Sequence, residues 1–145
     1  MTRKPDLRAV FRAALVFFLL AAVPQGVVAA PMSVGFWVNP KGSVVVQTGE
    51  CGPGLCGRVV WASQHALEKA RSGGVANLLG IQLLQDYRPS GAGLWHGTVY
   101  VPDMGRSFDS DLEQVSPTQI KIKGCVMGGL ICRSQIWTRI RQLPA

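Results

Sequence analysis

Residues 94–112 read LWHGTVYVPDMGRSFDSDL, and this stretch decides the fold. Two runs of β-forming residues flank Asp103-Met104-Gly105, a pattern typical of a β-hairpin with a three-residue loop, which sets Tyr100 opposite Phe108. Because side chains alternate along a strand, the acidic residues at 109, 111 and 113 share one face, which must be the outer one. The interior face is then predicted to carry the side chains of His96, Thr98, Tyr100, Phe108, Ser110 and Leu112.

The same β-rich pattern continues along the chain, with Gly, Pro, Asn and Asp between the runs. Strands are predicted at residues 34–38, 43–48, 57–62, 79–87, 94–101, 107–115, 119–126 and 131–141. One short helix is predicted at residues 64–71, before Gly73-Gly74. Eight strands joined mostly by tight turns predict an all-β fold, a single eight-stranded antiparallel up-and-down barrel without an exposed edge.

A second hairpin is predicted around Gly128-Gly129, which is typical of a two-residue turn. This turn sets Cys125 directly opposite Cys132, Ile122 opposite Gln135, and Ile120 opposite Trp137. By alternation, the side chains predicted to face the interior are those of Ile120, Ile122, Gln135, Trp137 and Arg139. A slip of one residue would invert both faces.

The N-terminus has the order of charges and apolar residues of a secretory signal peptide. Four basic residues precede an apolar run at residues 13–23, and the segment closes on the small residues Ala29 and Ala30. The run is shorter than the roughly 20 residues that a membrane-spanning helix needs. We therefore expect a signal peptide at residues 1–30, cleaved after Ala29 or Ala30. The mature domain, residues 31–145, would be periplasmic or secreted and without a membrane span.

All four cysteines lie in this mature part, as two close pairs that each bracket glycine-rich sequence. An exported chain with an even number of cysteines is typical of disulfide bonding. Three pairings are open, and the local one, Cys51 with Cys56 and Cys125 with Cys132, is favoured because turns bring its ends together. A four-cysteine zinc site is the alternative, but the spacing lacks Cys-x-x-Cys, so no metal is predicted.

The charge of the whole chain overstates that of the mature domain. Of 15 Lys/Arg and 8 Asp/Glu residues, the first thirty residues hold four basic and one acidic. The mature domain therefore carries a net charge of about +4, scattered along the sequence. This distribution argues against a nucleic-acid partner.

Two short motifs resemble the lipocalin and fatty-acid-binding superfamily. They are Gly35-Phe36-Trp37 on the first predicted strand and Trp137-Thr138-Arg139 on the last. The resemblance implies that the Trp37 indole plugs the closed end of the barrel and that the Arg139 guanidinium packs across it. Gly35, Trp37 and Arg139 are the residues assigned to this plug.

Over a longer stretch, the sequence resembles the bacterial domain-of-unknown-function family 2147, whose members are exported proteins with a lipocalin-like barrel. The matching elements span most of the mature part: Gly35-Phe36-Trp37, Cys51, Cys56-Gly57, Leu79-Gly80, residues 95–108 and residues 134–139. Residues 63–77 depart from the family pattern, because they lack the Asp/Asn-Pro loop common among relatives. Contacts made by that loop in relatives therefore do not carry over.

The predicted interior mixes apolar groups with polar ones, and each buried polar group without a partner costs about 1–3 kcal/mol. This mixture supports the hypothesis of a small amphipathic or apolar ligand, whose acidic head would meet Arg139 and His96. The residues assigned to this site are His96, Tyr100, Phe108, Gln135, Trp137 and Arg139. In the alternative, the barrel is filled, Arg139 belongs wholly to the Trp37 plug, and the protein is a structural or interaction protein of the cell envelope.

The sequence gives no sign of an enzyme. It contains no nucleophile elbow, zinc-protease helix or phosphate-binding glycine loop. A catalytic triad would need Ser110, His96 and an inward acid, but the neighbouring Asp109 and Asp111 are predicted to point outward. No catalytic residue and no cofactor is predicted. A protein partner would find Trp95, Val99 and Val101 on the predicted outer face, unless the helix at residues 64–71 covers them.

Overall fold

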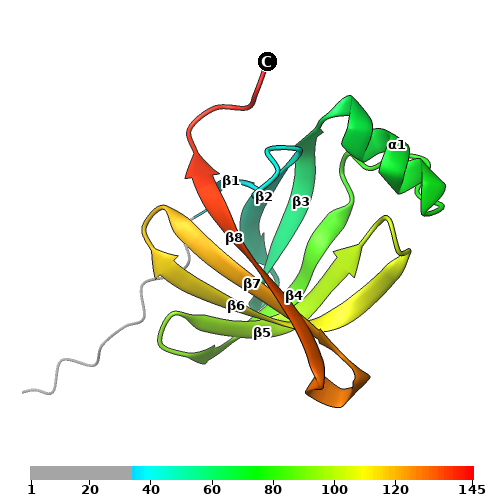
Figure 1. The fold of residues 1–145 in the computed structure, drawn as a ribbon. Helices are drawn as coiled ribbons and strands as arrows, with labels where there is room; N and C mark the ends of the chain where they lie inside the picture. Colours follow the sequence, from blue (N-terminus) through cyan, green and yellow to red (C-terminus); the bar gives the residue numbers. More distant parts are fainter. Residues whose placement is uncertain (1–33) are drawn as a thin grey trace, which may run out of the picture.

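A computed structural model describes residues 34–145 as a closed barrel of antiparallel strands with one α-helix (Figure 1). The eight strands are β1 (Gly35–Val38), β2 (Val44–Cys51), β3 (Gly54–Ala62), β4 (Gln82–Gly91), β5 (Leu94–Val101), β6 (Arg106–Ser116), β7 (Gln119–Val126) and β8 (Ile131–Ile140). Each strand pairs with the next along the chain, and β8 pairs with β1, which confirms the predicted up-and-down barrel. The predicted signal peptide lies outside the described residues.

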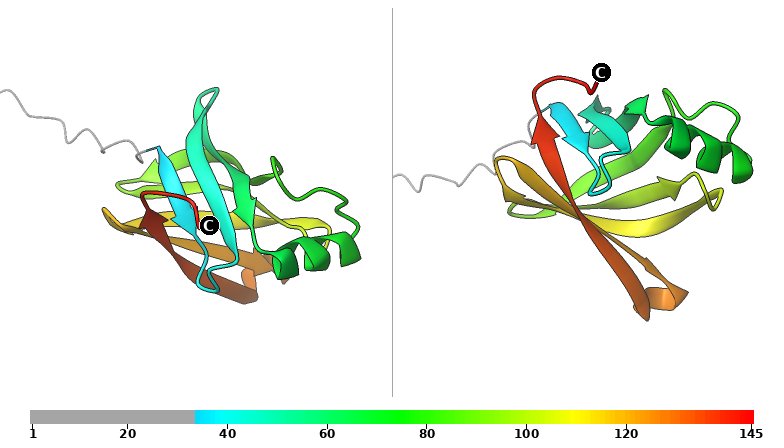
Figure 2. Two further views of the ribbon diagram at one scale, coloured as in Figure 1. Left: turned by 90° about the horizontal axis from the view of Figure 1, so that it is seen from above. Right: turned by 45° about the horizontal axis from the view of Figure 1, so that its top comes forward.

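The helix α1 (Gln64–Ser72) connects β3 to β4 and lies beside the β5–β6 turn (Figure 2). Its first turn is capped by Ser63, whose Oγ accepts a hydrogen bond of 3.2 Å from the Ala66 amide. Ala70, together with Val75 and Leu78 from the following loop, is buried in the same apolar cluster as the barrel interior. The helix therefore adds one layer of core beside the barrel.

The β5–β6 register differs by one residue from the sequence prediction. Val101 pairs with Arg106, so the turn comprises residues 102–105 and not three residues. Backbone hydrogen bonds from Met104 to Val101 (3.1 Å) and from Gly105 to Pro102 (3.2 Å) close this longer turn. Pro102, which a three-residue loop would leave paired with Arg106, thus belongs to the turn.

This slip reverses the predicted faces of β5, because a shift of one residue turns every side chain over. Trp95 is buried in the core cluster, whereas His96 is exposed and pairs with Asp111 across the strands. The prediction for β6 is correct, since Ser110 and Leu112 are buried while Asp109 and Asp111 are exposed. The predicted outer patch of Trp95, Val99 and Val101 is therefore wrong.

The β7–β8 register is confirmed. Cys125 pairs with Cys132, Ile122 with Gln135, and Ile120 with Trp137. The connection is a 3₁₀ turn at Met127–Gly129, not a two-residue turn, but it adds one residue on each side and leaves the register unchanged.

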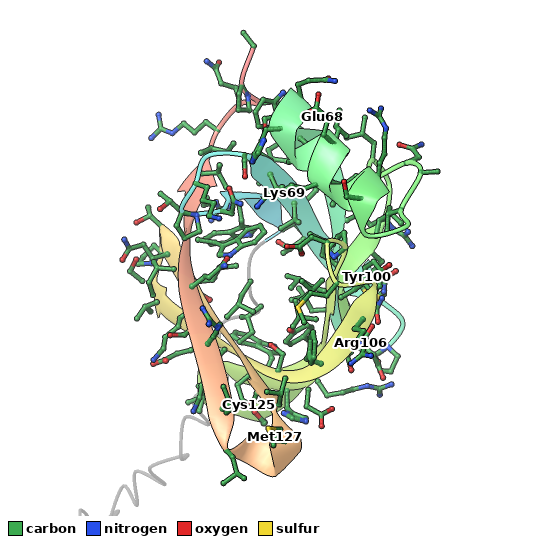
Figure 3. The ribbon with its side chains drawn as sticks, turned by 45° about the vertical axis from the view of Figure 1, so that its right-hand side comes forward. Glu68, Lys69, Tyr100, Arg106, Cys125 and Met127 are labelled. Carbon is green, nitrogen blue, oxygen red and sulfur yellow. A yellow bond between two sulfur atoms is a disulfide. The ribbon has the colours of Figure 1, made fainter. Side chains whose placement is uncertain are left out.

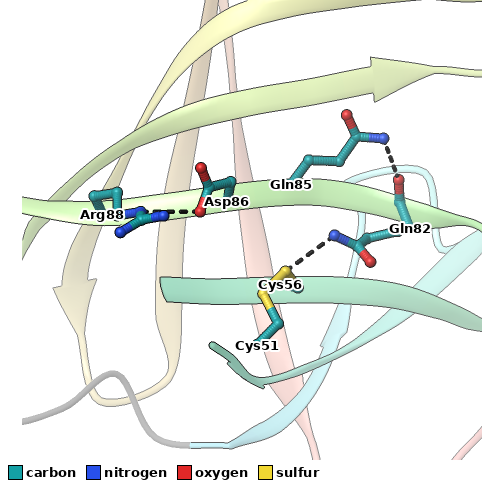
Figure 4. Close-up of a disulfide and its surroundings, with 6 residues drawn as sticks. All are labelled: Cys51, Cys56, Gln82, Gln85, Asp86 and Arg88. Atoms are coloured by element: carbon teal, nitrogen blue, oxygen red, sulfur yellow. Dashed lines mark hydrogen bonds and ion pairs between the residues drawn. A yellow bond between two sulfur atoms is a disulfide. The ribbon is translucent and has the colours of Figure 1, made fainter. Parts of the chain in front are cut away.

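Both disulfides join the pairs that the sequence favoured, Cys51 with Cys56 and Cys125 with Cys132. The first fastens the β2–β3 hairpin, and the Gln82 side-chain amide donates a hydrogen bond of 3.0 Å to Cys56 Sγ from β4 (Figure 4). The second closes the stem of the β7–β8 hairpin. Each bridge therefore stabilises the end of one hairpin.

Strand β4 begins three residues later and ends four residues later than predicted, and it contains a bulge. Residues 79–81 form a turn in which the Gly80 and Ile81 amides donate to the Val59 and Leu78 carbonyl oxygens. The bulge lies between Gln85 and Arg88, where Asp86 has a positive φ of 49°. It places the Tyr87 side chain in the interior, where it is fully buried.

Candidate functional site

The closed end of the barrel, here called the floor, is built around Trp37. The Trp37 side chain is fully buried, and its Nε1 donates a hydrogen bond of 3.0 Å to Thr48 Oγ1 on β2. Arg139 on β8 pairs with Trp37, and its guanidinium carbon lies 5.7 Å from the centre of the indole ring. The Arg139 Nη2 also donates to the Val34 carbonyl oxygen at 3.0 Å. The structure thus brings the two plug residues together by a cation–π contact.

Gly35 supplies the room that the guanidinium needs. A Cβ at residue 35 would lie 3.1 Å from Arg139 Nε and 3.2 Å from Arg139 Nη2, closer than side chains normally approach. Steric crowding by the Arg139 guanidinium therefore explains why residue 35, two residues before Trp37, is glycine. The charge of Arg139 is engaged in the plug and does not meet His96, which lies on the outer face of the wall.

Two buried hydroxyl groups lie close together inside the barrel, on Tyr87 and Ser110. Among residues 34–145, neither Tyr87 Oη nor Ser110 Oγ has a partner that meets the full geometry of a hydrogen bond, although Ser110 is near enough to lower the pKa of the phenol. Ser110 stands between Gly97 and Gly124 on the neighbouring strands. This row of small residues leaves space for the Tyr87 ring, which packs directly against the Gly97 backbone.

Burial raises the pKa of the Tyr87 phenol from 10.0 to about 12, and the nearby Ser110 hydroxyl offsets part of that rise. The folded state thus holds the phenolic proton over a pH range in which the unfolded chain releases it. The stability that this difference confers is fully present below pH 10.0 and is lost as the pH rises toward about 12.

Replacing Tyr87 with phenylalanine should therefore reduce the loss of stability in alkali. We expect the free energy of unfolding of the unaltered protein to fall by about 1 kcal/mol more than that of Tyr87→Phe between pH 9 and pH 11. Urea unfolding at a series of pH values measures this difference. Tyr100→Phe, which alters the second of the two tyrosines, is the control. If the free energy of unfolding had the same pH dependence in Tyr87→Phe and in the unaltered protein, the raised pKa of Tyr87 would be contradicted.

The barrel is less tightly closed toward the β5–β6 turn, at the end here called the mouth. Val99 and Phe108, which pair with each other, are half-buried, whereas Leu112 further along β6 is fully buried. Trp137 is buried, and its Nε1 donates a hydrogen bond of 3.0 Å to Oε1 of the exposed Gln135. Phe108 and Trp137 thus line the interior, with Gln135 at its exposed margin.

The remaining predicted ligand residues lie elsewhere. His96 Nδ1 is 2.9 Å from Asp111 Oδ1, and both side chains are more than half exposed. Tyr100 shares the strand face of His96 and packs, half-buried, against the edge of the core cluster. The predicted pairing of His96 with Arg139 around an acidic head is therefore wrong, because the β5 register turns His96 outward. Ser110 faces inward and cannot join the His96–Asp111 pair.

The outer wall carries a groove that the sequence did not reveal. It is an open hollow of about 290 Å³ over β4, β5 and β6, and its lining residues are Asp86, Arg88, Pro89, Ser90, His96, Gly97, Thr98 and Asp109. Inside it, Arg88 Nε and Asp86 Oδ1 form an ion pair of 2.9 Å, as Figure 4 shows. Asp86 lines the groove at the β4 bulge, where its φ is positive, and His96 lines it because the β5–β6 register turns this side chain outward.

Within residues 34–145, no group of three or more His, Cys, Asp or Glu side chains is placed to hold a metal ion. No helix in that part of the chain combines the length and apolar character that crossing a membrane requires.

Comparison with known proteins agrees with this geometry. The family model described as "Uncharacterized protein conserved in bacteria (DUF2147)" matches residues 35–139. A solved structure of HP1028 from the human pathogen Helicobacter pylori, described as belonging to the lipocalin family, superposes with a TM-score of 0.59 at 14% identity. The alignment covers 74% of this chain and 82% of that protein, and it shows a shared fold. No curated protein matches the chain.

Proposed function

Since the chain belongs to the DUF2147 family of uncharacterized bacterial proteins, we propose a function from its barrel: it is a non-catalytic binding protein for a small amphipathic molecule. We further propose that it works in the periplasm or outside the cell, after removal of the N-terminal segment. The ligand would lie with its apolar part at the mouth, against Val99 and Phe108, and with one polar group deeper in the barrel, at Tyr87 and Ser110.

The unpartnered hydroxyls of Tyr87 and Ser110 carry this proposal. A buried hydroxyl without a partner costs about 1–3 kcal/mol, so two adjacent ones need a reason. A polar group of a bound molecule would satisfy both. Phe108 and Val99 stand one strand repeat, about 7 Å, from Ser110 and Gly97 toward the mouth, and they would have to move to admit it.

A filled barrel that acts through its surface is the second candidate. It is favoured by the interior below the mouth, where the side chains of Trp37, Tyr87, Leu112 and Ile120 have no exposed area. In that case the hydroxyls of Tyr87 and Ser110 would face each other permanently, and nothing would enter. A ligand of this barrel must therefore be small.

Ser110→Ala distinguishes the two candidates. Without ligand, removing an unsatisfied hydroxyl is expected to raise the free energy of unfolding by up to about 1 kcal/mol. With a panel of short-chain and medium-chain carboxylic acids, the unaltered protein should show a rise in melting temperature and a change in tryptophan fluorescence. Ser110→Ala should show a smaller response to the same acids.

Ser134→Ala is the matched control, because Ser134 is exposed on the outer face of β8. It should behave as the unaltered protein in both measurements. If the unaltered protein and Ser110→Ala responded equally to the acids, the Ser110 hydroxyl would not be part of the binding site. No response to any acid would favour the filled barrel.

A further inference from the structure

The end of the β7–β8 hairpin projects beyond the rest of the barrel (Figure 1). Strand β6 pairs with β7 only as far as Gly124, and β1 pairs with β8 only from Thr138 onward. Cys125–Val126 and Ile131–Cys132 pair only with each other. Figure 3 shows Cys125 and Met127 at this free end. We call residues 126–131 the tip.

The tip is strongly apolar and exposed. Leu130 is 81% exposed, Met127 70% and Ile131 53%, and these are the three largest apolar side chains of the segment. Single exposed apolar residues are common on protein surfaces, but several together at the end of a projecting hairpin mark a contact site. The disulfide directly beneath the tip holds it in shape, which lowers the entropy cost of binding.

Two basic residues flank the stem immediately below the tip. Lys123 lies on one face of the hairpin and Arg133 on the other, and both are exposed. From residue 119 to the C-terminus the sequence holds five basic residues and no acidic one. Lys121 is paired with Glu113 at 3.4 Å and Arg139 stacks on Trp37, so Lys123 and Arg133 are the basic side chains nearest the tip that are directed to solvent. The acidic Asp111, which lies 2.9 Å from His96, is the neighbour of Lys123 on β6.

The spacing of apolar and basic residues fits the surface of a bilayer. Arg133 is three residues from Leu130, about 10 Å along a strand. Apolar groups of interfacial segments reach about 5–10 Å below the headgroups. A tip buried to that depth would bring Lys123 and Arg133 to the level of the lipid phosphates.

We propose that the β7–β8 tip docks the protein on a phospholipid bilayer that contains anionic headgroups. Met127, Leu130 and Ile131 enter the interface, and Lys123 and Arg133 contact the phosphates. The complementary charge favours this occupant over a second copy of the chain, because two such stems would repel each other. The inference does not depend on whether the barrel interior holds a ligand.

Sedimentation with vesicles tests the proposal. The protein used is the form that cells produce after any removal of the N-terminal segment. It should sediment with vesicles of equimolar phosphatidylglycerol and phosphatidylcholine, and much less with phosphatidylcholine alone. Leu130→Gln should lower the partition coefficient about tenfold. The double variant Lys123→Gln with Arg133→Gln should lower the partition coefficient about fivefold for each charge removed. Added salt should also lower the partition coefficient of the unaltered protein, because it screens the charges.

Matched control variants test whether the loss of an exposed apolar or charged side chain elsewhere on the surface also changes vesicle binding. Met104→Gln removes an exposed methionine from the β5–β6 turn, and Lys41→Gln with Arg71→Gln removes two exposed charges far from the tip in sequence. Both should bind vesicles as the unaltered protein does, and circular dichroism should show all variants folded. The proposal is wrong if the unaltered protein stays in the supernatant or if Leu130→Gln binds equally well. It is also wrong if gel filtration shows a dimer that Leu130→Gln dissociates without changing vesicle binding.

Discussion

Replacing Trp37 with alanine is expected to lower the free energy of unfolding by about 3–5 kcal/mol, the largest single-residue effect that the fold predicts. The indole is fully buried at the floor, donates to Thr48, and supports the Arg139 guanidinium. Its removal leaves a cavity at the point where β1 closes the barrel against β8. Because a small domain has only about 5–15 kcal/mol of stability, the variant should be close to unfolding.

Trp61→Ala is the control for the loss of a tryptophan as such. Trp61 on β3 is only half-buried, so less apolar area is returned to water when it is truncated. Urea unfolding, followed by circular dichroism, should show a much smaller decrease for this variant than for Trp37→Ala. Similar decreases for the two variants would show that Trp37 has no special role in closing the floor.

Gly97→Ala is expected to cost about 2–3 kcal/mol, although it adds only one methyl group. A Cβ at this position would lie 2.8 Å from the Gln85 carbonyl oxygen and from Tyr87 Cα. These are backbone atoms of the β4 bulge, so they can retreat only if the two strands separate. The same movement would displace the Tyr87 hydroxyl from Ser110.

Gly49→Ala is its matched control, because Gly49 also lies inside a strand. A Cβ there meets no atom within 4 Å. We expect this variant to be neutral or more stable by up to about 1 kcal/mol, since alanine restricts the unfolded chain. Thermal unfolding of the two variants side by side is the measurement. A neutral Gly97→Ala would contradict the close approach of β4 and β5.

The β7–β8 hairpin could be predicted closely because three independent signals agreed. The two cysteines, Gly128-Gly129, and the alternation of Ile120 and Ile122 with lysines all specify one register. On β5 the signals conflicted. The hydrophobic pattern favours Trp95 inside and His96 outside, but a three-residue turn requires the opposite, and Pro102 extended the turn by one residue.

Tyr87 and Ser110 show where sequence reasoning reached its limit. Ser110 was placed inside correctly, since the acids on either side fix the face of β6. Tyr87 could not be placed, because a bulge at Asp86 shifts the alternation and has no reliable signature when the residue is not glycine. The outer groove was missed for the same reason. Local registers thus decide the site, whereas the barrel itself follows from the strand count and turns.

The binding proposal and the docking proposal concern different parts of the molecule, and they can fail separately. Ser110 and Tyr87 lie inside the barrel, whereas Leu130 lies on the projecting tip. A variant at the tip should leave the response to acids unchanged, and Ser110→Ala should leave vesicle binding unchanged. If both proposals hold, the protein exchanges a small amphipathic molecule with a bilayer on which it rests.

Native mass spectrometry of the protein purified from cells that make it naturally tests the central claim most directly. We predict a population whose mass exceeds that of the polypeptide by one small molecule, released by mild activation and reduced in Ser110→Ala. A spectrum that contains only the bare polypeptide, with its disulfides intact, would contradict a ligand in the barrel.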